Sequence, residues 1–158
     1  VGSEMCIRDR RDCIRACNEL FFMNREEERT VSLDLMELNQ YTGECHFYKC
    51  GASASYWIRH GQIHEIAADR QPLGLSSVPS EFDKVLYLES GDTVVLLSDG
   101  IAEEFYERPE LLRAGMERLK TENPTDLATG ILELAVKAAG AIRDDMTVLV
   151  VSLYQEDN

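Results

Sequence analysis

Two segments in the C-terminal half of the chain are apolar without alternation, and they constrain the fold more than any other feature. Residues 94–97 read Val-Val-Leu-Leu, and residues 146–153 are apolar almost throughout. A strand with one wet face alternates apolar and polar side chains, whereas a strand that is covered on both faces need not. We therefore predict two buried strands, which require a further layer of structure on each face of their sheet.

Shorter strands are predicted upstream from period-two patterns and turn residues. Residues 30–38 alternate, and a glycine-containing turn leads to a return strand at 45–49, which makes a hairpin. A second hairpin is predicted from residues 55–59 and 62–66, and residues 84–88 are predicted to form one more strand. The first hairpin should have one face outward, and the two apolar strands of the C-terminal half should be the most buried.

Three helices are predicted from apolar spacing and from start and stop residues. Residues 12–23 carry apolar side chains at three- and four-residue steps, and a second helix spans about 108–120. The third opens at Asn123-Pro124 and ends at Gly140. Hairpins followed by helices and a closing strand indicate an α+β fold, a two-layer antiparallel β-sandwich flanked by helices.

Charge and cysteine usage exclude several classes of function. The net charge of −13 argues against nucleic acid as a partner, because phosphate contacts need clustered Lys and Arg. No apolar run approaches the ~20 residues of a membrane-spanning helix. Five cysteines without a Cys-x-x-Cys pair indicate reduced thiols and a cytoplasmic setting. Cys13 and Cys17, four residues apart, leave a zinc site open as an alternative to small buried side chains.

The first ten residues do not match the pattern that follows them. Residues 1–10 have neither helical nor strand periodicity and resemble a non-native leader left by translated adaptor sequence. We therefore exclude them from the fold prediction. Residues 11–158 are expected to be the C-terminal portion of a single domain, and the natural chain is expected to continue upstream.

Two acidic motifs adjoin the buried strands. Asp99 directly follows residues 94–97, in the motif Ser-Asp-Gly, and Asp144 opens the motif Asp-Asp-Met-Thr ahead of the last strand. A carboxylate at a strand end is held by rigid backbone and reaches solvent, which suits Mg²⁺ or Mn²⁺. Taken alone, the residue types fit a helix N-cap at Asp99 and a turn at Asp144 better than a metal site.

A set of motifs in a fixed order changes that interpretation. They are Thr-Val-Ser-Leu-Asp-Leu at 30–35, Tyr-Thr-Gly-Glu at 41–44, Cys-Gly-Ala-Ser-Ala-Ser at 50–55, Pro-Leu-Gly at 72–74, the Gly91 to Gly100 segment and Arg-Asp-Asp-Met-Thr-Val at 143–148. In this order and spacing, from residue 18 to 153, the chain resembles PPM-type (PP2C-like) serine/threonine phosphatases. Within that type it is most similar to the C-terminal part of the phosphatase domain of the stage II sporulation protein E family.

The resemblance implies a metal centre and a reaction. Asp99 and Asp144 match the family's metal-binding aspartates, and Asp145 is the less suitable ligand of its pair. The intact domain would hold two Mn²⁺ or Mg²⁺ ions, which activate a water that attacks phosphoserine, so no catalytic residue beyond the metal ligands is implied. The family's upstream Asp-Gly motif and first strands have no counterpart here. The chain alone is therefore expected to be inactive.

The resemblance also implies partners. The substrate would be a phosphorylated anti-anti-sigma factor, whose dephosphorylation activates a sporulation sigma factor. The domain would be cytoplasmic, with membrane attachment only through an absent N-terminal region, and a homodimer is left open. Two alternatives remain: a non-catalytic regulatory or binding module on the same fold, and a stress-response partner-switching phosphatase with a different substrate.

Overall fold

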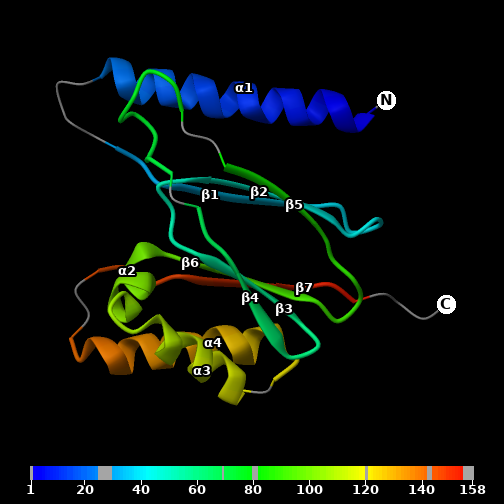
Figure 1. The fold of residues 1–158 in the computed structure, drawn as a ribbon, viewed down its shortest axis with the longest axis vertical. Coiled ribbons are helices and arrows are strands. Elements are labelled where there is room, and N and C mark those ends of the chain that lie inside the picture. The colour runs from blue at the N-terminus through cyan, green and yellow to red at the C-terminus, as the bar shows by residue number, and fades with distance from the viewer. Residues whose placement is uncertain are drawn as a thin grey trace. The chain divides into compact units, whose positions relative to one another are not determined.

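The computed structural model describes residues 2–24, 30–68, 70–79, 82–119, 121–141 and 144–154, with backbone alone at 2–9 and at Phe82. These residues form two compact units. The described parts of 1–37, 46–52 and 68–84 make the first unit, and those of 38–45, 53–67 and 85–158 make the second. Figure 1 shows the helices and strands along the chain.

Seven strands and five helical segments make up the described residues. In chain order they are α1 Gly2–Met23, β1 Leu33–Leu38, β2 Glu44–Cys50, β3 Ser55–Arg59, β4 Gln62–Ile66, β5 Phe82–Tyr87, β6 Thr93–Leu97, α2 Asp99–Ala102, the 3-10 helix η2 Glu103–Phe105, α3 Pro109–Leu119, α4 Pro124–Ala139 and β7 Val148–Ser152. The strands form two sheets, with the orders β1-β2-β5 and β4-β3-β6-β7.

The first unit has a core between α1 and the first hairpin. Ile14 of α1 clusters with Tyr48 and Cys50 of β2 and with Leu73, and all four are buried. Because α1 presents Ile14 and Phe21 on one side, its apolar spacing explains this packing. Asn18, 1% exposed, is satisfied by backbone groups, since its side-chain amide donates to Ser76 O and its side-chain oxygen accepts from Gly74 N–H.

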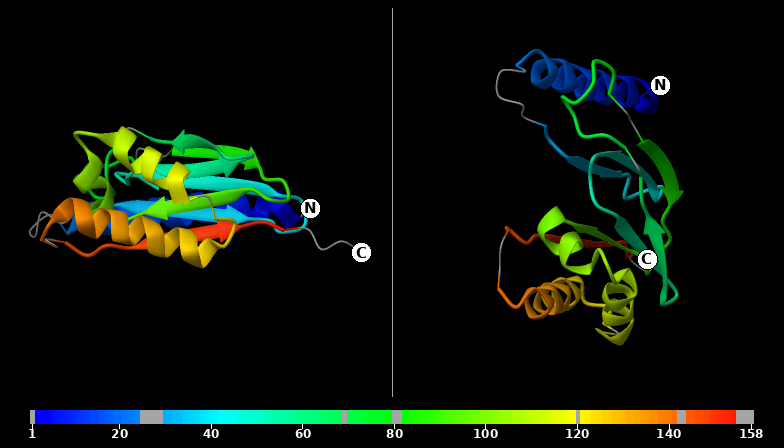
Figure 2. Two further views of the ribbon diagram at one scale, coloured as in Figure 1. Left: turned by 90° about the horizontal axis from the view of Figure 1, so that it is seen from below. Right: turned by 60° about the vertical axis from the view of Figure 1, so that its left-hand side comes forward.

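The second unit is a four-stranded antiparallel sheet with helices on one face. β3 pairs with β4 and with β6, and β6 pairs with β7. The helices α3 and α4 lie along the same face of this sheet, as Figure 2 shows. One core cluster joins that face to the helices, with Tyr56, Val95 and Leu97 from strands and Leu112 and Ile131 from helices. This sheet and its helices hold both acidic motifs.

The structure confirms the α+β class, with antiparallel sheet and flanking helices, and it confirms a strand in each of the predicted segments. The helix predicted near 123–139 is also confirmed: the Asn123 side chain accepts from the N–H groups of Thr125 and Asp126, and Gly140 ends the helix at φ 64°. Among the described residues, no helix is both long enough and apolar enough to cross a membrane.

Two predictions about the ends of the fold are wrong. The first helix begins at Gly2 rather than at residue 12, because a helical turn forms from backbone hydrogen bonds and needs no apolar stripe. The last strand is not among the most buried, since β7 lies at the end of its sheet and Leu149 is 52% exposed. The most buried strand is β2, in which every residue after Glu44 is buried.

Candidate functional site

Antiparallel pairing of β6 with β7 brings the two acidic motifs to the same end of the sheet. The register places Leu97 opposite Val148. Beyond this pair, Ser98 N–H donates to Thr147 O at 3.0 Å, and Thr147 N–H donates to Ser98 Oγ at 2.9 Å. The end of β6 and the start of β7 are therefore joined by hydrogen bonds from both backbone and side chain.

Asp99 lies at the point where β6 turns into α2. Ser98 is the N-cap of this short helix and Asp99 is its first residue, so the N-cap interpretation of Asp99 is wrong. Asp99 is half-buried, and its Oδ1 accepts a hydrogen bond of 2.5 Å from Ser53 Oγ, in the segment before β3. The carboxylate is thus held from a neighbouring segment and remains accessible to solvent.

Asp144 lies beside Gly100, the neighbour of Asp99. A Cβ added to Gly100 would lie 3.3 Å from Asp144 Cβ and 2.6 Å from Asp145 O, so only glycine permits this approach. The side chain of Asp144 is exposed, and its Oδ1 accepts from Asp145 N–H at 2.8 Å. The chain therefore places the segments that carry Asp99 and Asp144 in direct contact, although 45 positions separate the two residues.

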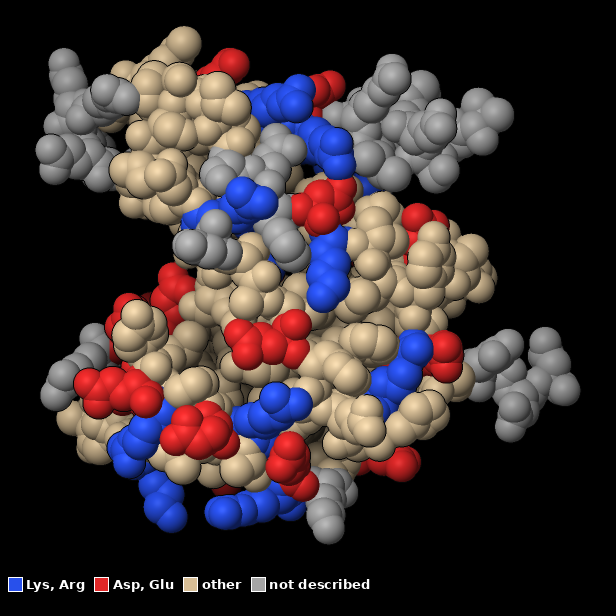
Figure 3. Space-filling view, in the orientation of Figure 1, with Lys and Arg blue, Asp and Glu red and all other residues tan. Residues whose placement is uncertain are grey.

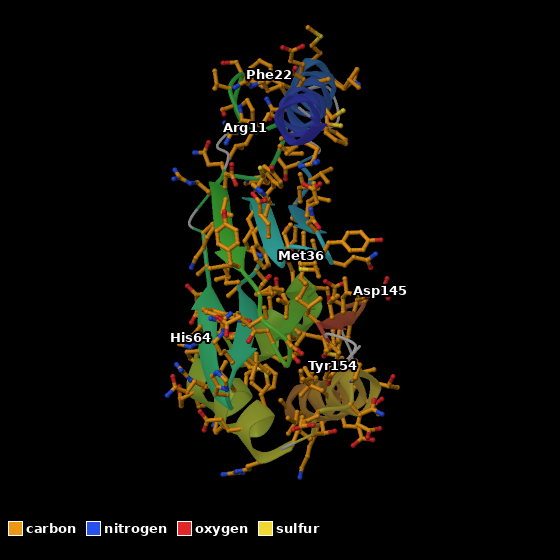
Figure 4. The ribbon with its side chains drawn as sticks, turned by 90° about the vertical axis from the view of Figure 1, so that its right-hand side faces the viewer. Arg11, Phe22, Met36, His64, Asp145 and Tyr154 are labelled. Carbon is orange, nitrogen blue, oxygen red and sulfur yellow. The ribbon has the colours of Figure 1, made fainter. Side chains whose placement is uncertain are left out.

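Asp145 has a different arrangement from its neighbour. Its backbone oxygen accepts from Ser98 Oγ at 3.2 Å, and Figure 4 shows the residue just ahead of β7. The contact uses the backbone of Asp145 and helps to hold the connection onto the end of β6. This leaves Asp144 as the residue whose Cβ faces Gly100.

The donor set at this end of the sheet fits a hard cation in part. Asp99 offers a carboxylate directly after Ser98 at the end of β6, and Asp144 offers one in the segment that leads into β7. Carboxylate oxygens are the ligands that Mg²⁺ and Mn²⁺ prefer. Within the described ranges, no three His, Cys, Asp or Glu side chains come together as a metal site. Further ligands of a bound ion would have to be waters or groups outside these residues.

Other ionisable residues have contacts of their own. Asp34 Oδ2 lies 2.6 Å from the ammonium of Lys49, a side chain that is 0% exposed. His46 is buried on β2 and stacks on Tyr48. His64 lies on β4, the edge strand on the other side of the sheet from β7 (Figure 4). Its ring packs against Trp57 of β3.

Ser53 is the site residue to which sequence reasoning assigned no role. It belongs to the Gly-Ala-Ser motif at 51–53, which contributed to the family resemblance without a function of its own. Its contact with Asp99 joins residues 46 positions apart, so no local pattern could reveal it. The sequence offers one weak indication: Ser53 is a polar residue in a motif of otherwise small, mostly apolar residues, and this does not identify Asp99 as its partner.

The four described cysteines are thiols outside any disulfide. Cys13 and Cys17 are exposed on α1, whereas Cys45 and Cys50 are buried in β2. The exposure of the first pair differs from the small buried side chains that the sequence favoured, because α1 turns this side of its surface to solvent. The remaining cysteine, Cys6, lies among the residues of which only the backbone is described.

Comparison with known proteins gives one family and one fold. The family described as "Stage II sporulation protein E (SpoIIE)" matches residues 8–154. The stage II sporulation protein E of Bacillus subtilis (strain 168) is 30% identical over 152 residues, which cover 92% of this chain and 18% of that protein. The chain therefore spans less than a fifth of the length of this relative.

Solved structures show the same relationship. The phosphatase domain of the cell fate determinant SpoIIE from Bacillus subtilis (Mn presoaked) matches with a TM-score of 0.70 at 28% identity, over 80% of this chain and 58% of that one. The catalytic domain of the serine/threonine protein phosphatase PstP, in complex with two manganese ions, matches with a TM-score of 0.70 at 19% identity, over 89% and 68%. The second likeness shows the fold alone.

Proposed function

Because the chain belongs to the stage II sporulation protein E family, we propose that it is the C-terminal part of a metal-dependent protein-serine phosphatase domain. The observation that carries the proposal is the contact between the Asp99 and Asp144 segments at the end of the β6–β7 pair. In this proposal residues 11–158 are the native portion and residues 1–10 a leader. The family match begins at residue 8, close to that boundary.

Asp99 and Asp144 would hold Mn²⁺ or Mg²⁺, with two ions in the intact domain. The manganese named for the related SpoIIE and PstP structures supports this choice of ion. Bound metal supplies Lewis-acid polarisation of phosphoryl oxygens and makes a water nucleophilic at neutral pH. The residues of this chain would contribute position and charge: Ser53 would orient the Asp99 carboxylate, and Gly100 lets the segment that carries Asp144 approach the start of α2.

The proposed substrate is a phosphoserine on an anti-anti-sigma factor, whose dephosphorylation would activate a sporulation sigma factor. The 30% sequence identity to a sporulation protein, which extends over 92% of this chain, supports this assignment over a stress-response substrate. The same relationship supports a cytoplasmic domain, with a membrane anchor and a homodimer belonging to the intact protein.

A non-catalytic binding module is the second candidate. It is favoured by the observation that, of the side chains the structure describes, no three potential ligands meet. Two carboxylates without a third anionic ligand hold a divalent cation loosely, because few negative oxygens replace the waters that the ion loses. Under the phosphatase proposal, we therefore expect the 158-residue chain alone to be inactive and the chain extended upstream to be active.

Phosphate release tests both candidates. A phosphoserine peptide is incubated with the 158-residue chain and with the upstream-extended chain while Mn²⁺ is titrated. We expect turnover in the extended chain alone, and Asp99→Asn or Asp144→Asn should remove most of it with little change in melting temperature. Full activity of the short chain would show that a metal ligand is misassigned. An extended chain that stays inactive, with Mn²⁺ bound or not, would favour the binding module.

A further inference from the structure

A cavity of about 390 Å³ in the second unit has Asp99 and Ser53 in its wall. Its floor is apolar and aromatic, with Tyr56 from β3 and Phe105 from η2, both less than a tenth exposed. The cavity therefore begins at the proposed metal ligand and extends away from it between the sheet and the helices that follow β6. No part of the proposed function so far uses this space.

The polar groups at the cavity all favour positive charge. Glu65 and Glu103 line it with exposed side chains, in addition to Asp99. None of the described residues in its wall is Lys or Arg. Figure 3 shows acidic side chains gathered over α2, next to which Glu103 lies. The whole chain is also acidic, with a net charge of −13.

Tyr56 remains an uncharged aromatic wall under ordinary conditions. Burial raises the pKa of its hydroxyl, and the negative charge of Glu65 raises it further, while Arg113 acts in the opposite direction. A neutral phenol ring offers an electron-rich face to a cation. Tyr106, a second phenol in the wall, is 86% exposed.

This combination fits one kind of side chain. Lys and Arg carry an apolar stem that packs on aromatic walls and a cationic head that meets carboxylates at a rim. An acidic side chain would be repelled by Glu65 and Glu103, and a purely apolar one would make no use of these two carboxylates. Charge complementarity therefore selects a basic residue as the occupant.

We propose that this cavity binds a Lys or Arg side chain of the protein substrate, a few residues from the phosphoserine. The proposal rests on the proposed function, because Asp99 is common to the cavity wall and to the metal site. An extended peptide advances ~3.3 Å per residue, so a residue two to four positions from the phosphoserine can reach a cavity that borders the site. The cavity then sets sequence preference, and the metal centre sets the reaction.

Peptide binding to the upstream-extended chain tests the proposal without requiring turnover. Labelled phosphoserine peptides carry Lys, norleucine or Glu at one flanking position, which is scanned from four residues before to four after the phosphoserine. Fluorescence anisotropy measures each Kd. At one or two positions we expect the Lys peptide to bind three- to tenfold more tightly than the norleucine peptide, and the Glu peptide to bind most weakly.

Variants then locate the preference. Glu65→Gln with Glu103→Gln should reduce the ratio of Kd values between norleucine and Lys peptides to less than about twofold, since both rim charges are lost. Glu133→Gln, which removes one negative charge from the exposed surface of α4 outside the cavity, should leave the ratio unchanged. Equal affinity for all three peptides at every position would overturn the proposal. So would a preference that the double variant retains.

Hydrolysis of a small aryl phosphate by the same proteins separates the two proposals. This reaction reports on the metal centre, because its substrate carries no basic side chain. Absence of hydrolysis in every protein, together with a Lys preference in binding, would contradict the phosphatase and support the cavity. Hydrolysis without a preference for the Lys peptide in binding would support the phosphatase and contradict the cavity.

Discussion

Ser53 Oγ donates a hydrogen bond of 2.5 Å to Asp99 Oδ1, joining the segment that enters β3 to the first residue of α2. This contact fixes the rotamer of the carboxylate that we assign to the metal. The side chain of Ser53 is itself half-buried, so its position depends on the packing around it and not on solvent. Partners of this kind orient metal ligands in many proteins and affect metal affinity strongly.

Replacing Ser53 should weaken metal binding without unfolding the chain. In the upstream-extended protein, we expect Ser53→Ala to raise the Kd for Mn²⁺ about tenfold, because the Asp99 carboxylate loses its orienting donor. Ser53→Thr keeps the hydroxyl and should restore most of the affinity. Electron paramagnetic resonance of free Mn²⁺ measures the Kd, and circular dichroism checks the fold. Equal Kd values for Ala and wild type would mean that the hydrogen bond has no role in metal binding.

Gly100→Ala should disturb the site because the added methyl group has no room beside the Asp144–Asp145 segment. The added Cβ would meet Asp145 O at 2.6 Å, so the Asp144–Asp145 segment must shift. We expect a loss of ~1–3 kcal/mol in the free energy of unfolding, measured by urea denaturation, together with weaker Mn²⁺ binding.

Gly91→Ala is the matched control for that change. Gly91 lies in the turn before β6 with φ 92°, and a Cβ there would meet nothing within 4 Å. The substitution should cost ~1–3 kcal/mol through backbone strain and leave the Kd for Mn²⁺ unchanged. If both variants lose metal affinity equally, general destabilisation is the cause and the contact at Gly100 is not.

Asp92 should make the stability depend on pH. Burial alone would raise the pKa of this carboxyl, but hydrogen bonds from Arg59 and from the Glu89 N–H outweigh burial and lower the pKa below 3.8. A lowered pKa stabilises the folded chain above pH 3.8, and this contribution disappears as pH falls through the folded-state pKa.

Asp92→Asn tests that dependence. At pH 7 the variant should lose ~2–4 kcal/mol of stability, because Arg59 keeps its charge and loses the buried carboxylate. Below about pH 4 the difference between variant and wild type should shrink, as wild-type Asp92 takes up a proton. Urea denaturation across this range measures it, and Glu107→Gln, exposed and outside this network, serves as the control. A difference independent of pH would contradict the assignment.

Asp34 should contribute to the folding stability of the chain and not to metal binding. Its carboxylate faces the fully buried ammonium of Lys49, so Asp34→Ala removes a counter-charge inside the first unit. We expect a loss of ~3–5 kcal/mol, with Mn²⁺ affinity unchanged in the protein that remains folded. Asp34→Leu combined with Lys49→Met should recover most of the stability. Loss of Mn²⁺ binding in that double variant would instead make Asp34 a candidate metal ligand.

The sequence predicts the parts of the fold in which local pattern and tertiary packing agree. The second hairpin was placed at Ser55–Arg59 and Gln62–Ile66, because alternation and the His60-Gly61 turn specify both strands and their register. The ends of α4 follow from capping residues for the same reason: Asn123 and Gly140 act on their own backbone neighbours.

The remainder depends on information that a local pattern does not contain. An apolar run predicts burial of β7, but composition cannot show that the strand has one neighbour in its sheet. Asp99 follows the end of β6 and Asp144 lies four positions ahead of β7, while their role as metal ligands stays a prediction. The hydrogen bond from Ser53 depends on how β3 and β6 pair, which is a property of the assembled sheet.

The position of β7 has a practical consequence for anyone who handles this polypeptide. Within the described residues the strand pairs with β6 alone, so its outer N–H and C=O groups face away from any partner strand. Such a row is a template on which a second extended chain can assemble, and the exposed Leu149 adds an apolar contact. Purified at high concentration, the 158-residue polypeptide should form oligomers or aggregates through this edge strand. Adding a charge to β7, as in Leu149→Lys, should keep the polypeptide monodisperse.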